Sequence, residues 1–260
     1  MNCREITDKI EQVYPKSAAL GFDNVGLQAG RAEKEVKKIY LALDATDEVI
    51  RNTIAWNADM LITHHPLIFS PLKAVTDEDF VSRRILTMIR QDISYYAMHT
   101  NYDVLGMASL AEKKMRLQDT EVLDVTAEIC GKPEGIGRIG TLQRSMTLRE
   151  CCEYTKDCLG VEKVKVFGEQ DRQIERLAIS PGSGKSAVMP AIEKGADVLV
   201  TGDIGHHDGL DALEQGLCII DAGHYGTEYM FLEDMESFFK RYCPEVCVKA
   251  EERKIPFQII

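Results

Sequence analysis

Two adjacent histidines, His64 and His65, end an apolar run that resembles a buried strand, and Pro66 stops this run. The chain has only six histidines, and imidazole is the most common side-chain ligand of metal ions in proteins. Successive residues of extended backbone project to opposite sides, and a proline favours extended backbone in the residue before it. We therefore expect these imidazoles to bind two metal ions about 3.5–4 Å apart, rather than one ion.

Two further pairs of potential ligands follow predicted strands with the same four-residue spacing, and each pair is a histidine and a carboxylate. A single histidine at a strand end is usually structural, and an acidic residue there is usually a helix cap. Because ligands of open α/β sheets bind beyond the carboxyl ends of the strands, three such strand ends together favour a site. The predicted metal ligands are His64, His65, Asp103, His224 and Glu228.

This ligand set contains three imidazoles, two carboxylates and no sulfur, which suits Zn, Fe, Mn, Ni or Co and does not choose between them. Two divalent ions carry more positive charge than two carboxylates offset. The remainder favours a hydroxide and an anionic or carbonyl-type oxygen of a substrate. Since metal binding can lower the pKa of water to about 7, the chemistry indicated is hydrolysis by metal-activated water.

Other polar residues are candidates for catalytic roles. His99, which starts one of the spaced pairs, could be a ligand, a proton shuttle or a residue that supports a ligand. A second dense cluster contains Asp203, His206 and His207. It could handle substrate protons, or it could cap the N-terminus of a helix, and the sequence does not decide between these readings.

A glycine-rich turn at residues 180–186 resembles the end of a phosphate-binding loop, but Ile179 stands where that motif needs its first glycine. The sequence therefore disfavours a nucleotide-hydrolysing P-loop. The backbone N–H groups of Gly182 and Gly184 could still bind an anion. Together with Asn24 from an earlier glycine-rich stretch, these glycines are the candidate substrate-binding residues.

The elements that must position these residues alternate between strands and helices, which predicts an α/β fold with largely parallel sheets. Residues 57–63 match residues 195–201, and residues 97–103 match residues 222–228. The first match alone is within chance for buried strands, but the second aligns a histidine and a carboxylate and favours an internal duplication. We expect two similar α/β domains with the metal site in the cleft between them.

The expected first domain contains residues 1–128 and about 222–260, and the second contains residues 129–221. The glycine- and proline-rich stretch Gly131–Gly140 is the predicted boundary or linker, and Gly21–Gly30 is a predicted shaped loop.

Composition restricts the partners and the location. The net charge of −11 and the pI of about 5.1 disfavour a protein that binds nucleic-acid backbones. No apolar run is long enough to span a membrane, and the polar N-terminus predicts no signal peptide. Eight cysteines without C-x-x-C spacing indicate buried thiols in a reducing cytoplasm. A zinc or redox site built on cysteine is the alternative that this spacing does not favour.

Several motifs resemble those of the GTP cyclohydrolase I type 2 family, also called Nif-three-like dinuclear metal-centre hexameric proteins. Tryptophan is common in that family where this chain has Phe22. The matching stretches span nearly the whole chain and are 22–28, 62–66, 99–103, 201–203 with 206–208, and 221–228. The resemblance implies the same five ligands, two similar α/β domains and a toroidal homo-hexamer with metal sites facing an internal cavity.

The leading hypothesis for function is a dinuclear-metal-dependent hydrolase, similar to a GTP cyclohydrolase. Its substrate would be a nucleotide-like or other small phosphorylated molecule, and this part of the hypothesis rests on the resemblance. The alternative is a non-catalytic metal-binding ring protein that stores, delivers or inserts metal. The polar residues beyond the five ligands favour the enzyme, because a metal carrier would not need them.

Overall fold

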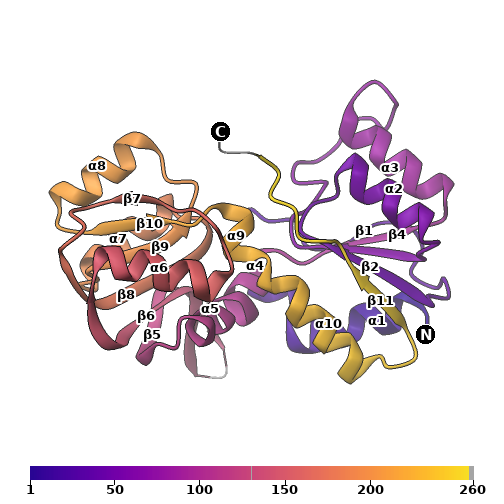
Figure 1. Cartoon of the computed structure of the whole chain (residues 1–260). Helices are drawn as coiled ribbons and strands as arrows, with labels where there is room; N and C mark the ends of the chain where they lie inside the picture. Colours follow the sequence, from indigo (N-terminus) through magenta and orange to yellow (C-terminus); the bar gives the residue numbers. More distant parts are fainter. Residues whose placement is uncertain (130, 258–260) are drawn as a thin grey trace. The chain divides into compact units, whose positions relative to one another are not determined.

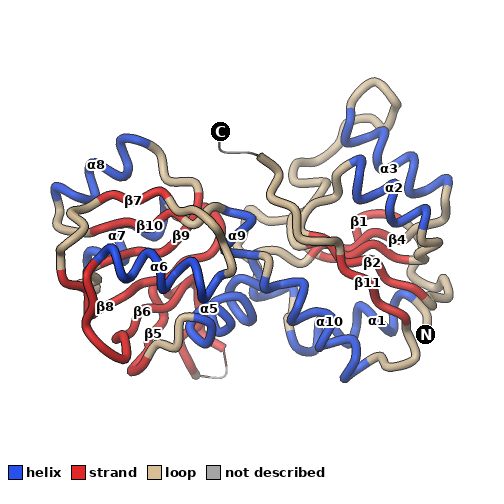
Figure 2. Tube along the Cα trace, in the orientation of Figure 1, coloured by secondary structure: helices blue, strands red, loops and turns tan. Residues whose placement is uncertain are grey.

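The computed structural model describes residues 1–129 and 131–257, which form two compact units. The first unit contains Met1–Tyr102 and Phe231–Lys254, and the second contains Asp103–Met230 and the segment that begins at Ile255. Each unit is built on one β-sheet with helices on its faces (Figures 1 and 2). The fold is therefore a mixed α/β fold with two sheets.

The sheet of the first unit has the strand order β1-β4-β3-β2-β11. Strands β4, β3, β2 and β11 are parallel, and β1 pairs antiparallel with β4. In this register Leu61 lies between Tyr40 and Tyr95. The bounds are β1 Gly26–Ala29, β2 Lys38–Ala42, β3 Met60–Thr63, β4 Ser94–Ala97 and β11 Cys247–Ala250.

Helices cover both faces of this sheet, which explains why β2, β3 and β4 are almost continuously apolar. On one face, α2 (Asp47–Ala55) and α3 (Phe80–Arg90) pack on a core that includes Leu61 and Tyr95. Helices α1 (Cys3–Val13) and α10 (Met230–Tyr242) lie on the opposite face (Figure 1). Because neighbouring strand residues point to opposite faces, each strand contributes to both layers.

The sheet of the second unit has the order β5-β6-β8-β9-β10-β7. The pairs β8–β9 and β9–β10 are parallel. The pairs β5–β6, β6–β8 and β10–β7 are antiparallel. The expectation of largely parallel sheets is therefore wrong for this unit. The bounds are β5 Gln118–Ile129, β6 Lys132–Thr147, β7 Lys165–Phe167, β8 Gln173–Ser183, β9 Val198–Gly202 and β10 Cys218–Asp221.

The helices of the second unit also form two layers. Helices α7 (Val188–Glu193) and α8 (His206–Glu214) pack on the face that presents Ile219. Helix α6 (Leu148–Leu159) lies on the other face (Figure 1) and begins with a Thr147–Glu150 capping box, as the sequence predicts. The short helices are α4 (Thr100–Tyr102), α5 (Ala108–Lys114) and α9 (His224–Glu228).

The two sheets share one strand topology. In the first unit, parallel strands β2, β3 and β4 are followed in the sheet by antiparallel β1; in the second, β8, β9 and β10 are followed by antiparallel β7. Helix α2 connects β2 to β3, and α7 connects β8 to β9. Helix α3 connects β3 to β4, and α8 connects β9 to β10. His99 follows β4 and His224 follows β10, so these histidines hold equivalent positions in their sheets.

Two segments differ from the sequence prediction. Gly131–Gly140 is not a linker, because Lys132 onward forms β6. The glycines within β6 are explained by close strand approach: a Cβ on Gly135, for example, would overlap the backbone carbonyl of Asp124 in β5. The predicted loop Gly21–Gly30 also contains β1 in its second half, where pairing with β4 satisfies the backbone.

The unit boundaries also differ from the predicted residues. The prediction gave residues 103–128, residues 222–230 and the segment from Ile255 to the first domain, whereas the contacts place them in the second unit. The physical reasons are that β5 pairs with β6 and that α9 packs against β8 and β9.

The burial of the cysteines agrees in part with the expectation of buried thiols. Five cysteines are buried, Cys158 is half-buried and Cys247 is exposed, while Cys130 lies outside the described residues. Within the described chain, none of the helices has the length and apolar character needed to cross a membrane.

Glu251, directly after β11, gives the first unit a pH-dependent stability. Its carboxylate accepts the Leu43 N–H at 2.8 Å. Burial raises the pKa of Glu251 to about 7 against the lowering effect of this hydrogen bond, and Asp44 and Glu48 raise it further. Between the ordinary carboxyl pKa and about 7, the folded chain keeps a proton that the unfolded chain has lost, so stability falls as the pH rises.

We expect Glu251→Gln to stabilise the metal-free protein at pH 8 by about 2 kcal/mol and to have little effect at pH 4.5, because glutamine removes the buried charge. Denaturant unfolding at both pH values measures this difference. Glu252→Gln, at the exposed neighbouring position, is the matched control. Equal effects of Glu251→Gln at the two pH values would contradict the prediction.

Candidate metal centre

His64 is fully buried at the end of β3 in the first unit. Its Nδ1 lies 2.9 Å from the Met98 carbonyl oxygen. A carbonyl oxygen only accepts hydrogen bonds, so Nδ1 carries the proton and Nε2 carries the ring lone pair. The ring packs beside Phe231 and Tyr102, with centroid distances of 5.2 Å and 6.1 Å. This packing fixes the direction of the Nε2 lone pair.

His65 follows His64 in a bend directly after β3, so the extended backbone and the opposite projection expected for this pair are not what the structure shows. The ring of His65 has its own partner. Its Nδ1 lies 2.9 Å from Asp44 Oδ1. Asp44 comes just after β2, the parallel neighbour of β3. Asp44 and His65 therefore lie together beyond the carboxyl ends of these two strands. The ring centroids of His64 and His65 are nevertheless only 4.9 Å apart. The pair therefore converges although different groups support each ring.

His99 completes a group of three imidazoles in the first unit. Its ring centroid lies 5.3 Å from that of His64 and 5.6 Å from that of His65. Its Nδ1 is 3.0 Å from Asp23 Oδ1, and Asp23 Oδ2 accepts the Thr100 N–H at 2.9 Å. Burial acts to raise the pKa of Asp23, but hydrogen bonds from His99 and Thr100 outweigh it and hold the pKa well below its usual range. Asp23 is therefore ionised.

These three histidines fit a transition-metal ion. One potential ligand atom of each lies within 4.8 Å of the others. Each Nδ1 faces an oxygen acceptor, which leaves Nε2 as the donor atom for a metal. Metal-bound histidines typically donate their other ring N–H to a carboxylate or a backbone carbonyl, and both kinds of acceptor occur here.

The second unit repeats this pattern at His224, the first residue of α9. His224 Nδ1 lies 2.7 Å from Asp203 Oδ2, and its Nε2 lies 3.2 Å from Glu228 Oε2. Glu228 is one helical turn further on and only 3% exposed. An imidazole and a carboxylate thus present their donor atoms together, which is the chemistry of a metal ligand pair.

Gly182 packs directly against this pair. It has φ +79°, and a Cβ there would overlap the Glu228 carboxylate. Its N–H donates to Thr227 Oγ1 at 3.0 Å, and the Gly184 N–H donates to the Gly202 carbonyl at 2.9 Å. Both N–H groups therefore make hydrogen bonds within the protein, which favours a structural role over the predicted anion binding.

The remaining predicted site residues have various surroundings. Asp103 is half-buried and begins a π-helical turn, Asp103–Met107, a feature frequent at functional sites. His206 and His207 start α8, are exposed, and belong to no metal-capable group of the described residues. The Asn24 side-chain N–H donates to the Ile68 carbonyl at 2.5 Å, which ties two loops of the first unit together.

Sequence reasoning missed Asp23 and Asp44, the two carboxylates that orient His99 and His65. Asp44 had a usable signal, since it follows a predicted parallel strand and must lie at the same edge as His65. Asp23 lies far from His99 in the sequence and reaches it because β1, which follows it closely, pairs with β4. Because β1 was not predicted from the sequence, this contact could not be predicted either.

Comparison with known sequences supports the family resemblance that the motifs indicate. Residues 1–256 match the model of a family described as Duf34/NIF3 (NGG1p interacting factor 3). A protein of Clostridium perfringens named "GTP cyclohydrolase 1 type 2 homolog" is 35% identical over 269 aligned residues and the match covers 100% of both chains. A protein of Methanocaldococcus jannaschii with the same name is 32% identical, and the match covers 92% of this chain and 94% of that one.

Comparison with solved structures finds similar folds, one of them in a protein related to NIF3. A Bacillus cereus protein described as related to NIF3 superimposes with a TM-score of 0.90 at 27% identity, covering 100% of this chain and 99% of that one. The structure titled "Reduced HcgD from Methanocaldococcus jannaschii" superimposes with a TM-score of 0.82 at 30% identity, covering 96% and 97%.

The Met98 contact predicts one tautomer for His64. In the metal-free protein at pH 8, we expect its proton on Nδ1, because the Met98 carbonyl can only accept it. Long-range ¹H–¹⁵N correlation spectra of the imidazole rings distinguish the two nitrogens, and the exposed His207 serves as the internal reference. A proton on Nε2 of His64 would contradict the geometry that directs this atom toward a metal.

Proposed function

The chain belongs to the Duf34/NIF3 family, and on this premise we propose that it is a hydrolase that depends on two divalent metal ions. The observation that carries the proposal is the group His64, His65 and His99, in which every Nδ1 faces an oxygen acceptor. Such a set presents three Nε2 lone pairs. We assign those of His64 and His65 to the metal ions and that of His99 to proton transfer, and a purely structural histidine cluster has no need of this arrangement.

The proposed ligands of the two ions are donors from both units, and Zn, Fe, Mn, Ni or Co would suit them. The shared strand topology supports an internal duplication, in which His224 corresponds to His99 and Asp203 to His65. The duplication would explain why both units carry metal donors at equivalent strand ends. The proposed ligand set is His64, His65, Asp103, His224 and Glu228.

Bound ions of this kind supply Lewis-acid activation of water and of a substrate oxygen. The protein's own contribution is orientation and proton movement. The ionised Asp23 fixes the His99 ring, so that its Nε2 can accept a proton from the attacking water and return it to the leaving group. Asp203 has the corresponding orienting role toward His224, which replaces the direct catalytic role that the sequence suggested.

The substrate class in this proposal is a nucleotide-like or small phosphorylated molecule. It rests on the curated relatives named "GTP cyclohydrolase 1 type 2 homolog". A toroidal homo-hexamer is proposed on the family resemblance alone. Catalysis is what distinguishes this function from metal storage or delivery, and the Asp23–His99 pair favours catalysis, since a carrier does not need a proton relay.

We expect His64→Ala and Glu228→Ala to lose stoichiometric metal binding, because each removes a proposed donor. Elemental analysis and calorimetric titration with Mn, Zn and Fe measure this loss. His207→Ala, which removes an exposed histidine, is the control and should keep the wild-type metal content. Full metal content in both donor variants would eliminate the proposed site.

Asp203→Asn tests the orienting carboxylate separately. Loss of such a partner typically weakens metal affinity about 10–100-fold, while the ligands themselves remain. We therefore expect reduced affinity with retained stoichiometry in the same titration. An unchanged affinity would show that the 2.7 Å contact with His224 does not matter for metal binding.

Turnover of a panel of nucleotides and phosphoesters by metal-loaded protein tests the reaction itself. We expect hydrolysis with at least one of Mn, Zn or Fe, and a marked loss of kcat in Asp23→Asn. Absence of turnover with every metal, together with transfer of metal to an apo-acceptor, would support the carrier instead.

A further inference from the structure

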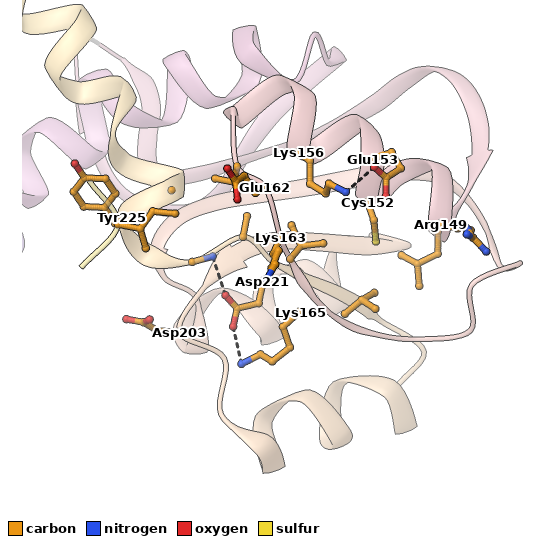
Figure 3. A pocket seen from close by; sticks show the side chains of 18 of the residues that line it. Arg149, Cys152, Glu153, Lys156, Glu162, Lys163, Lys165, Asp203, Asp221 and Tyr225 are labelled. Carbon is orange, nitrogen blue, oxygen red and sulfur yellow. Dashed lines mark hydrogen bonds and ion pairs between the residues drawn. The ribbon is translucent and has the colours of Figure 1, made fainter. Parts of the chain in front are cut away.

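A large cavity in the second unit is not explained by the metal ligands. Its volume is about 1240 Å³, and it lies at the carboxyl ends of β9 and β10 (Figure 3). Small-molecule sites commonly have volumes of about 300–1,000 Å³ and occur at this end of open α/β sheets. The cavity is therefore large enough for a whole nucleotide with water.

The floor of the cavity is a fixed and neutral ion pair. Asp221 is only 7% exposed and lies 2.8 Å from the Lys165 ammonium group. The same carboxylate accepts the N–H groups of Ile204 and Gly223, each at 3.0 Å. These bonds anchor the loops after β9 and β10, so the floor is preorganised and adds no net charge for a ligand.

The walls of the cavity are mainly apolar and aromatic. Val161, Val164 and Val166 contribute aliphatic surface, and Tyr225 and Phe257 contribute rings. Phe257 is 57% exposed although it lines the cavity. An aromatic side chain with so much exposed surface at a cavity gains burial when a flat apolar group covers it. The walls therefore suit a planar ring.

A charged side chain marks one end of the cavity and an aromatic side chain marks the other. Figure 3 places Arg149 and Tyr225 at opposite ends, with Lys163 between them. Lys156 is paired with Glu153 at 2.6 Å, whereas no ion pair among the described residues engages the Arg149 guanidinium. A planar guanidinium is well matched to phosphate oxygens. The Arg149 end is therefore suited to a phosphate group.

The Tyr225 end adjoins the proposed metal ligands of this unit. Asp203 and Gly223 line the cavity. Gly223 directly precedes His224, and the Asp203 carboxylate lies 2.7 Å from His224 Nδ1. The Asp203 carboxylate can accept hydrogen bonds from N–H groups of a ring. A ligand with its phosphate at Arg149 would thus bring its ring toward His224.

We propose that this cavity binds a nucleotide, with the phosphates at Arg149 and Lys163 and the heterocyclic ring at the Tyr225 end, covered by Phe257. The choice of a nucleotide rests on the proposed hydrolytic function. The binding itself uses no metal donor, so the site can be tested in metal-free protein.

Calorimetric titration of the metal-free, full-length chain with GTP, guanosine and inorganic triphosphate tests both ends of the cavity. GTP should bind more tightly than either fragment. Arg149→Ala should weaken GTP and triphosphate about tenfold, as expected for one charge-assisted hydrogen bond, and leave guanosine unchanged. Phe257→Ala should weaken GTP and guanosine and leave triphosphate unchanged.

Matched controls are available outside the cavity. Arg144→Ala removes another exposed arginine of the second unit, and Phe80→Ala removes a phenylalanine of similar exposure in the first unit. Both should bind all three probes like the wild type. Failure of GTP to bind, or equal binding by Arg149→Ala, Phe257→Ala and their controls, would overturn the inference.

The outcome is separable from that of the hydrolase proposal. If the two cavity variants weaken GTP binding but metal-loaded protein turns over no nucleotide, the cavity stands and the hydrolase proposal fails. If nucleotides are hydrolysed with a KM that both variants leave unchanged, the hydrolase stands and the cavity proposal fails.

Discussion

The central constraint on the candidate centre is that a neutral imidazole has one N–H and one lone pair. An acceptor fixed at Nδ1 therefore decides which atom is left to bind a metal. In this chain the Met98 carbonyl, Asp44, Asp23 and Asp203 each fix one ring. All of them lie near strand ends or in the turns that follow, so the sheets set the tautomers before any ion binds.

Preorganisation by the sheets also explains the local packing. His64 can be fully buried because its Nδ1–H has a backbone partner and its faces meet aromatic rings. Glu228 is almost as buried, and Gly182 lies where any larger residue would displace its carboxylate. Burial of side chains in this way keeps their geometry fixed, which is what the proposed metal centre would require of its donors.

Much of this arrangement was predictable because it depends on periodicity. The apolar run before His64 and the spacing of His224 to Glu228 both follow from local patterns. The expected alternation at His65 was wrong, because the backbone bends directly after β3 and brings the two rings together. The orienting carboxylates were not predictable in the same way, since Asp23 meets His99 through the pairing of β1 with β4. The glycines of β6 were misread as a linker because close strand approach and flexibility both favour glycine. A single sequence does not separate those two causes.

The boundary between the two units falls between Tyr102 and Asp103. It therefore cuts through the five-residue motif that starts at His99, and the three residues between these ends are all buried. A gene fragment that encoded either unit alone would carry only part of the proposed donor set and would begin or end among buried residues. Although each sheet has its own helices, a chain that was shortened to one unit at this boundary would divide the motif.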